Sequence, residues 1–176
     1  MHGRDRRKSA GRPGQPVASP QAARAATHLP RPPLLSLAAI AASLALNYFY
    51  PLPYLGSPLA DILFAAGWLL VAGSVALGLS AVRTLHRHRT TVLPTRAANE
   101  LVTTGPYAIS RNPIYLGIAM ATVGIGLITG IVWFFGAAFL AAALTHRLAI
   151  LPEERHLDAR FGKRFRDYRR SVRRWI

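Results

Sequence analysis

Apolar residues concentrate in four stretches of the chain, which polar or turn-forming segments separate. The stretches cover residues 34–50, 59–82, 114–129 and 131–151. A run of about 17–25 apolar residues is long enough to cross a bilayer as a helix. The third run is the shortest, and it gives roughly 24 Å of helix for a hydrocarbon core of ~30 Å. The pattern predicts an all-α membrane protein with about four transmembrane helices.

The connections on one side of this arrangement are short and uncharged. Residues 51–58 carry no charge, and Gly130 alone separates the third run from the fourth. The third and fourth spans are therefore expected to form a tight hairpin. Asp61 lies in the first turn of the second span, where an acid stabilises the helix dipole. Pro152 directly follows the fourth run and is expected to end that span.

Downstream of Pro152 the chain is polar, with apolar residues at every third or fourth position. These are Leu157, Phe161, Phe165, Tyr168, Val172 and Trp175. The spacing predicts an amphipathic cytoplasmic helix over residues 153–176, with an Arg-rich opposite face. We expect it to lie along the inner membrane interface with its aromatic face toward the lipid. Gly162 interrupts the pattern and predicts a bend.

The distribution of basic residues predicts the orientation in the membrane. All 22 Lys and Arg residues lie in residues 1–33, 83–111 and 147–174. Basic segments stay on the cytoplasmic side during insertion, so both termini and the long middle loop should be cytoplasmic. A net charge of +15 is also typical of nucleic-acid-binding proteins, but 51% hydrophobic residues favour the membrane interpretation. We therefore expect membrane lipids as partners and no nucleic acid.

Composition adds three expectations. Residues 1–33 are rich in Arg, Pro, Gly and Ala and should form a disordered basic arm, which leaves residues 34–176 as a single domain. The abundance of Arg, Ala, Gly and Pro is typical of a GC-rich bacterial genome, which places the protein in a bacterial inner membrane. The absence of cysteine excludes disulfides, thiolate metal ligands and a cysteine nucleophile, and we predict no metal site.

The middle loop contains the first candidate site, at the start of the third span. Pro113 suits the first turn of that helix, so Arg111 and Asn112 fall at its N-terminus. Backbone N–H groups point outward there, which favours an anion. Two structural explanations stay open, in which Arg111 reaches lipid headgroups and Asn112 caps the helix.

The second candidate site is the pair of adjacent acids that follows Pro152. Glu153 and Glu154 could stabilise a helix dipole, or they could hold a cationic group or ribose hydroxyls of a ligand. Neighbouring residues on a helix point about 100° apart, so only one of the two is expected to face a ligand directly. At the inner end of the fourth span, Arg147 either reaches the headgroups or holds an acidic substrate.

Two blocks of sequence together resemble a known superfamily. GPYAISRNPIYLG, followed about forty residues later by EERHLDARFGKRFRDYRRSVRRWI, is similar to the isoprenylcysteine carboxyl methyltransferases and phospholipid methyltransferases, which are integral membrane enzymes. The resemblance covers roughly residues 59–176. It implies that S-adenosylmethionine binds at the cytoplasmic side. The cofactor contacts that it implies are Gly105, Tyr107, Arg111, Asn112, Pro113, Tyr115, Gly124, Gly126, Glu153 and Glu154.

One residue departs from the resemblance. The eukaryotic prenylcysteine enzymes have a histidine where this chain has Asn112. Asparagine offers a donor and an acceptor but does not titrate near neutral pH. A titrating role therefore does not carry over to Asn112, and the prenylcysteine substrate does not carry over with it.

Methyl transfer from a sulfonium needs alignment and desolvation more than a nucleophilic side chain. The resemblance therefore predicts S-adenosylmethionine-dependent methylation of an amphiphilic substrate that enters from the bilayer, with Arg111 and Arg147 as cationic anchors for an acidic acceptor. Two alternatives stay open. One is an NADPH-dependent membrane lipid reductase, and the other is a non-catalytic membrane scaffold. The oligomeric state and the methyl acceptor do not follow from the sequence.

Overall fold

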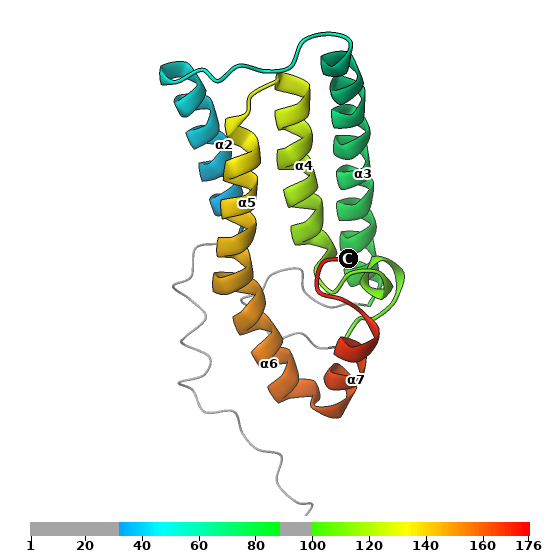
Figure 1. Cartoon of the computed structure of the whole chain (residues 1–176). Coiled ribbons are helices and arrows are strands. Elements are labelled where there is room, and N and C mark those ends of the chain that lie inside the picture. Colours follow the sequence, from blue (N-terminus) through cyan, green and yellow to red (C-terminus); the bar gives the residue numbers. More distant parts are fainter. Residues whose placement is uncertain (1–31, 89–99) are drawn as a thin grey trace, which may run out of the picture.

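Every regular element that the computed structural model describes, in residues 32–88 and 100–176, is helical. The four longer helices are α2 (Pro32–Phe49), α3 (Leu59–Arg87), α4 (Pro113–Thr129) and α5 (Trp133–Thr145). They stand side by side in the order α2, α5, α4, α3, and neighbours in this order contact each other (Figure 1). The short helix η1 (Gly105–Ala108), the N-terminus of α4 and the C-terminal helices gather at one end of this bundle. We call it the site end.

Close backbone contact joins α3 to α4, and small residues permit it. A methyl group added at Gly67 would lie 2.9 Å from the carbonyl oxygen of Gly124, and one added at Gly117 would lie 3.2 Å from the carbonyl oxygen of Ser74. Any larger side chain at Gly67 or Gly124 would force the helices apart. This pairing fixes the position of α4, and therefore of the side chains at its N-terminus.

The outer surface of the bundle is apolar. Trp68, Leu69 and Phe139 all expose more than half of their side-chain surface. Two helical segments, Leu59–Arg87 and Trp133–Phe161, are long and apolar enough to cross a membrane, and two shorter apolar helices accompany them. Apolar residues on the outside of a helix bundle are typical of a protein that is solvated by lipid.

Helices α2 and α4 agree with the predicted runs, whereas α3 ends later than predicted. Helices α2 and α4 begin and end within two residues of the runs 34–50 and 114–129, and α5 follows the predicted turn at Gly130, whose φ of 67° ends α4. Helix α3 extends to Arg87, five residues beyond the predicted end at Val82. Its last turns are stabilised by contacts, since Leu85 is buried and Thr84 lies against Gly105.

The prediction that Pro152 ends the fourth span was wrong. Helix α5 continues through a π-helical turn, η2 (His146–Ile150), directly into α6 (Leu151–Phe161). In η2 the Leu151 N–H donates to the carbonyl of His146, five residues earlier. This wider turn immediately precedes Pro152, and it accommodates a residue that has no N–H and that would crowd a regular helix. A helix of 29 residues results.

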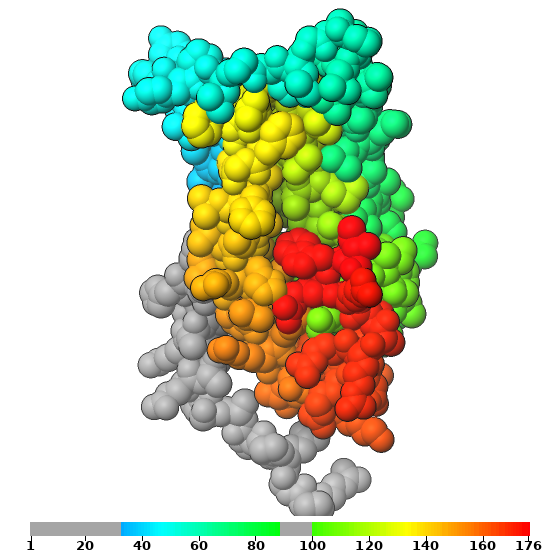
Figure 2. All heavy atoms as spheres, viewed as in Figure 1, coloured from blue at the N-terminus to red at the C-terminus, as the bar shows by residue number. Residues whose placement is uncertain are grey.

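The predicted single helix over residues 153–176 was also wrong in part. Gly162 adopts a φ of 53°, which breaks the segment into α6 and α7 (Lys163–Ser171), so the predicted bend is confirmed. Helix α7 then ends, and residues 172–176 are not helical. We call these five residues the tail. In Figure 2 the tail, drawn in the deepest red, lies on the face of the bundle between α4 and the α5–α6 helix.

The aromatic face of the C-terminal segment packs against protein, which corrects the expectation that it faces lipid. Phe165 and Tyr168 are buried with Leu101, and Leu157, Phe161 and Val172 pack around them. Leu101 lies shortly before residues 105–112, which lead into α4. This cluster therefore attaches α7 to the segment before α4. Packing against a protein surface gives the same periodicity as packing against a membrane.

Some predictions fall outside the described residues. They are the disordered arm, apart from the two residues that begin α2, and positions 89–99 of the middle loop.

Candidate functional site

The candidate site forms where η1, the N-terminus of α4, α6 and the tail meet. Pro113 occupies the first turn of α4, as the sequence predicts, and it is buried. Asn112 holds the capping position, but its side chain makes no capping hydrogen bond. Instead, the Asn112 Nδ2 group donates to the carbonyl oxygen of Arg174, 3.2 Å away. The capping explanation for Asn112 is therefore wrong, and this amide binds the tail.

The carboxylate of Glu154 is held between two guanidinium groups. Arg174 Nε lies 2.9 Å from Oε1 and Arg174 Nη2 lies 2.6 Å from Oε2, which is a bidentate hydrogen bond. Arg111 Nη1 lies 2.9 Å from Oε1 on the other side. The side chains of Arg111 and Glu154 are only 9% and 10% exposed. Pairs that are buried and bidentate are among the stronger ionic contacts in proteins.

Arg111 keeps unused hydrogen-bonding capacity. Its Nε and Nη1 groups are buried, and neither has an acceptor with hydrogen-bond geometry among the described residues, although Nη1 makes the ionic contact with Glu154. Burial lowers the pKa of Arg111, and Glu154 opposes that shift. Buried donors without a partner are costly and mark a place where a ligand can complete the bonding.

The hydrogen-bonded contact with Glu154 raises the pKa of Arg174. Both guanidinium groups therefore stay charged at neutral pH. Two positive charges and one negative charge leave the cluster with a surplus of one positive charge.

The tail also binds through its backbone. The Arg111 N–H donates to the carbonyl of Arg173 at 3.0 Å. The Ser110 hydroxyl donates to the carbonyl of Arg174 at 3.2 Å and also accepts from the Asn112 N–H. Ser110 is buried, so these bonds have little competition from water. The tail thus satisfies polar groups immediately before α4.

Glu153 has a different environment. The Tyr115 hydroxyl donates to its Oε2 over a long distance of 3.4 Å. Burial raises the pKa of Glu153, the bond from Tyr115 lowers it, and the charge of Glu154 raises it further. Burial also raises the pKa of Tyr107, and the negative charge of Glu153 contributes to that shift. Tyr107, Tyr115 and Glu153 therefore form a second polar cluster, and no cation within residues 32–88 and 100–176 forms an ion pair with this carboxylate.

A hydrogen bond holds η1 against α7. The Tyr168 hydroxyl donates to the carbonyl of Tyr107 at 2.6 Å, and burial raises the pKa of Tyr168 to about 12, partly offset by Arg111. The hydroxyl therefore stays protonated near neutral pH and remains a donor. Gly105 begins η1 with a φ of 62°, a conformation that side chains rarely adopt.

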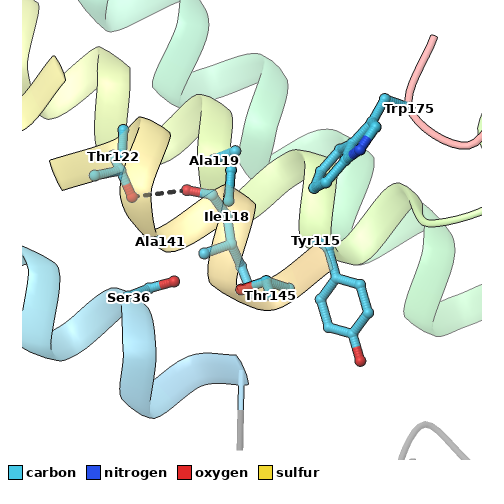
Figure 3. Close-up of a pocket in the computed structure, with 10 residues that line it drawn as sticks. Ser36, Tyr115, Ile118, Ala119, Thr122, Ala141, Thr145 and Trp175 are labelled. Carbon is cyan, nitrogen blue, oxygen red and sulfur yellow. Dashed lines mark hydrogen bonds between the residues drawn. The ribbon is translucent and has the colours of Figure 1, made fainter. Parts of the chain in front are cut away.

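A small open groove lies between α2, α4 and α5 beside Tyr115, and its cavity volume is about 10 Å³. Most of its walls are small or apolar, and Trp175 of the tail lies at one end (Figure 3). The Tyr115 ring lines the same end, with its hydroxyl directed away from Ala119 and Thr122. The complete lining is Ser36, Tyr115, Ile118, Ala119, Thr122, Ala138, Ala141, Ala142, Thr145 and Trp175.

Three residues expected in the site lie elsewhere. The space beside Gly124 is filled by Val71 and the backbone of α3, and the space beside Gly126 is filled by Phe134. These contacts explain both glycines by helix packing and give no support to the prediction that they line a cofactor pocket. Arg147 is exposed on η2, apart from the cluster around Glu154. Its neighbour His146 contacts Arg174 through Nε2 at 3.3 Å.

Arg174 and Ser110 are the site residues that the sequence interpretation missed. Arg174 is one of many arginines in its segment, and no local pattern distinguishes it from its neighbours. Ser110 lies inside the block GPYAISRNPIYLG, directly before Arg111, but the sequence interpretation assigned no contact to it. Within residues 32–88 and 100–176, no group of three or more His, Asp or Glu side chains could hold a metal ion.

Comparison with known proteins shows the family of the chain. Residues 62–164 match the family model described as phospholipid methyltransferase. Over 77 residues the chain is 39% identical to the nickel-cobalt-cadmium resistance protein NccN of Alcaligenes xylosoxydans xylosoxydans, which covers 44% of this chain and 36% of that protein. It is 34% identical over 77 residues to the cobalt-zinc-cadmium resistance protein CzcN of Cupriavidus metallidurans, covering 44% and 35%. The chain thus aligns with about a third of the length of each relative.

Proposed function

The chain belongs to the phospholipid methyltransferase family, and on that premise we propose that it transfers a methyl group from S-adenosylmethionine to an amphiphilic substrate in the membrane. The observation that carries the proposal is the convergence of two clusters of opposite character at the end of an apolar groove. Arg111 offers buried N–H donors, and Glu153 offers a carboxylate that has no ion pair with any residue the structure describes. A zwitterionic cofactor with a carboxylate and a sulfonium matches both.

The residues present fit this cofactor. Arg111 would bind its carboxylate, because the surplus positive charge and the unused donors favour an anion near the N-terminus of α4. Glu153 would accept hydrogen bonds from ribose hydroxyls or attract the cationic sulfur, while Tyr107 and Tyr115 shield it from water. Glu154 would act indirectly by holding Arg111 in place. Once bound, the cofactor supplies an electrophilic methyl group.

The chain's own residues would orient the cofactor and the acceptor and exclude water from them. Transfer from a sulfonium disperses charge, so a site with little water accelerates it. The rings of Tyr115 and Trp175 and the small residues of the groove would exclude water from the acceptor. Arg147 is exposed at the site end. We propose, as in the sequence analysis, that it attracts the headgroup of an acidic acceptor.

We further propose that α2, α3, α4 and α5 all cross the membrane, with both termini and the site end in the cytoplasm. The distribution of Lys and Arg supports this orientation. At 17 residues α4 is short for a helix that crosses the hydrocarbon core. The polar residues that surround its N-terminus at the site end can stay in the headgroup region, so α4 has to span only the apolar part of the bilayer. Reporter fusions at the C-terminus and within residues 51–58 test the orientation, and an external C-terminus would contradict it.

The test of function is calorimetric titration of the detergent-purified protein with S-adenosylmethionine, and with NADPH in parallel. Saturable binding of S-adenosylmethionine that competition with S-adenosylhomocysteine abolishes would support the methyltransferase. Binding of NADPH alone would replace it with the lipid reductase, and binding of neither would leave the scaffold. The metal-resistance names describe the two relatives, and the proposal for this chain does not rest on them.

A further inference from the structure

The tail, residues 172–176, leaves α7 at Ser171 and returns to the N-terminus of α4. Its apolar residues Val172 and Trp175 contact protein, as their periodicity favours, but that periodicity does not predict the contacts of Arg174. The polar contacts of the tail concentrate on this one residue. Arg174 binds Glu154 through its guanidinium, and through its carbonyl it binds Asn112 and Ser110. One residue near the C-terminus thus links α6 to α4.

We propose that Arg174 is a positioning residue of the methyl-transfer site and that the tail completes this site; the inference rests on the proposed function. Arg174 and Arg111 share one carboxylate, so Arg174 fixes where Glu154 lies and hence where Arg111 is held. Without Arg174, the Glu154 carboxylate keeps only its contact with Arg111 and loses the bidentate pair that fixes its orientation. The buried N–H donors of Arg111 then lose their fixed orientation toward a ligand.

The position of Arg174 also sets the position of Trp175. The indole is the next residue along the tail, and it lines the groove beside Tyr115 (Figure 3). Tyr115 in turn donates to Glu153. One anchoring residue therefore connects the Glu154 cluster, the Glu153 cluster and the mouth of the groove. The tail is not part of α7, which ends at Ser171. The contacts of Arg174, and not a continuing helix, therefore fix the position of the tail.

Part of the anchoring is independent of the side chain. The carbonyl of Arg174 and that of Arg173 accept bonds from Asn112, Ser110 and the Arg111 backbone. An alanine at position 174 retains these carbonyls and loses the bidentate contact with Glu154 and the contact with His146. Arg174→Ala therefore separates the guanidinium from the backbone contacts, whereas removal of the tail eliminates both.

The first experiment is independent of any ligand. In a background with Trp68→Phe and Trp133→Phe, Trp175 is the remaining tryptophan of the chain, and its fluorescence reports the tail. We expect Arg174→Ala to increase quenching by aqueous iodide about twofold or more, because the indole leaves the groove. The matched control is Arg170→Ala, which removes an exposed arginine of α7 and should leave quenching unchanged. Equal quenching in all three proteins would overturn the anchoring role.

The second experiment measures S-adenosylmethionine affinity and steady-state kinetics in the same variants. We expect Arg174→Ala to weaken binding about tenfold or more, Arg174→Lys to recover part of this, and Arg170→Ala to stay within about twofold. In combination with Glu154→Gln, Arg174→Ala should add little further loss, because both act on Arg111. Additive losses, or an unchanged affinity in Arg174→Ala, would overturn the positioning role.

The two failures are distinguishable. If the unaltered protein binds no S-adenosylmethionine, the proposed function fails and the positioning role fails with it, while the iodide measurement still decides whether Arg174 anchors the tail. If the unaltered protein binds and Arg174→Ala binds equally well despite an exposed Trp175, the function stands and the inference fails. Thermal unfolding of each variant in detergent identifies any that do not fold, and the milder Arg174→Lys replaces Arg174→Ala in that case.

Discussion

Glu153 and Glu154 are neighbours in the sequence and have opposite environments in the structure. Glu154 lies between two guanidinium groups, with contacts of 2.6–2.9 Å. Glu153 has a tyrosine hydroxyl at 3.4 Å and no ion pair among the described residues, and burial raises its pKa. The first carboxylate is neutralised within the protein, and the second is the one that we propose interacts with a ligand. Adjacent identical side chains thus take different roles because the helix directs them to different neighbours.

The comparison shows how a buried charge can be either structural or functional. A carboxylate that two arginines satisfy stabilises the fold and would be costly to remove. A carboxylate whose ionised form is disfavoured costs folding free energy, and such residues cluster at binding and catalytic sites. The predictions below separate the two roles by measuring stability and cofactor affinity together.

The largest effect is expected for Glu154→Gln. The neutral amide leaves Arg111 and Arg174 facing each other without a counter-charge, and Arg111 is largely buried. Breaking such a pair costs about 3–5 kcal/mol, so we expect a clear fall in the unfolding temperature together with a sharp but measurable fall in cofactor affinity. Thermal unfolding in detergent and calorimetric titration measure the two. Unchanged stability would contradict the ionic cluster.

Glu153→Gln should behave in the opposite way. Its raised pKa means that the ionised carboxyl is disfavoured in the folded protein, so a neutral isostere should leave stability unchanged or increase it. Cofactor affinity should fall about tenfold, the effect of a lost hydrogen bond to a charged group. Loss of stability equal to that of Glu154→Gln would remove the distinction between the two acids.

The stability difference between Glu153→Gln and the unaltered protein should depend on pH. The folded-state pKa of Glu153 is raised above its ordinary value of 4.5, so ionisation destabilises the fold at neutral pH. As pH falls through the raised pKa, protonation removes that cost, and the two proteins should become equally stable below about 4.5. Tyr115, Tyr107 and Glu154 face this carboxyl. The two tyrosines stay protonated between pH 4 and 8, so they do not contribute to the pH dependence of the stability difference. Unfolding temperatures at pH 4 to 8 measure the difference, and a constant gap would contradict the assignment.

Tyr115→Phe should have a smaller effect. It removes only the hydroxyl that donates to Glu153 over 3.4 Å, a long and therefore weak bond. We expect cofactor affinity to fall by about 0.5–1.5 kcal/mol, which is roughly threefold to tenfold. Titration alongside Glu153→Gln measures it. If Tyr115→Phe lowered affinity more than Glu153→Gln did, the tyrosine and not the acid would be the main contact.

The smallest effect on cofactor binding is expected for Arg147→Ala. Arg147 is exposed on η2 and stands apart from both acids, so affinity for S-adenosylmethionine should stay within about twofold. If Arg147 attracts an acidic acceptor, the same variant should raise KM for that acceptor with kcat unchanged. A loss of cofactor affinity comparable to that of the Glu153 variant would assign Arg147 to the cofactor site instead.

Much of the helical arrangement followed from local patterns. Apolar runs predicted α2 and α4 to within two residues, and the turn at Gly130 followed from a glycine between two such runs. The errors share a cause. Pro152 continues a helix because a π-helical turn precedes it, and the aromatic face of α7 is buried because Leu101 covers it. The continued helix at Pro152 and the buried face of α7 both depend on neighbouring structure, which the spacing of apolar residues along a segment does not encode.

The sequence by itself determined the helical class and the placement of Arg111 and Asn112 at the start of a helix. It also determined the clustering of basic residues and membership of a family whose model matches residues 62–164. Only the tertiary structure decided which acid Arg174 binds, that Asn112 binds the tail, and that Gly124 packs against α3. The physical reason is sequence separation. Local patterns report which face of a segment is buried, whereas contacts such as Arg174–Glu154 and Asn112–Arg174 join residues 20 and 62 positions apart, and folding of the whole chain selects them.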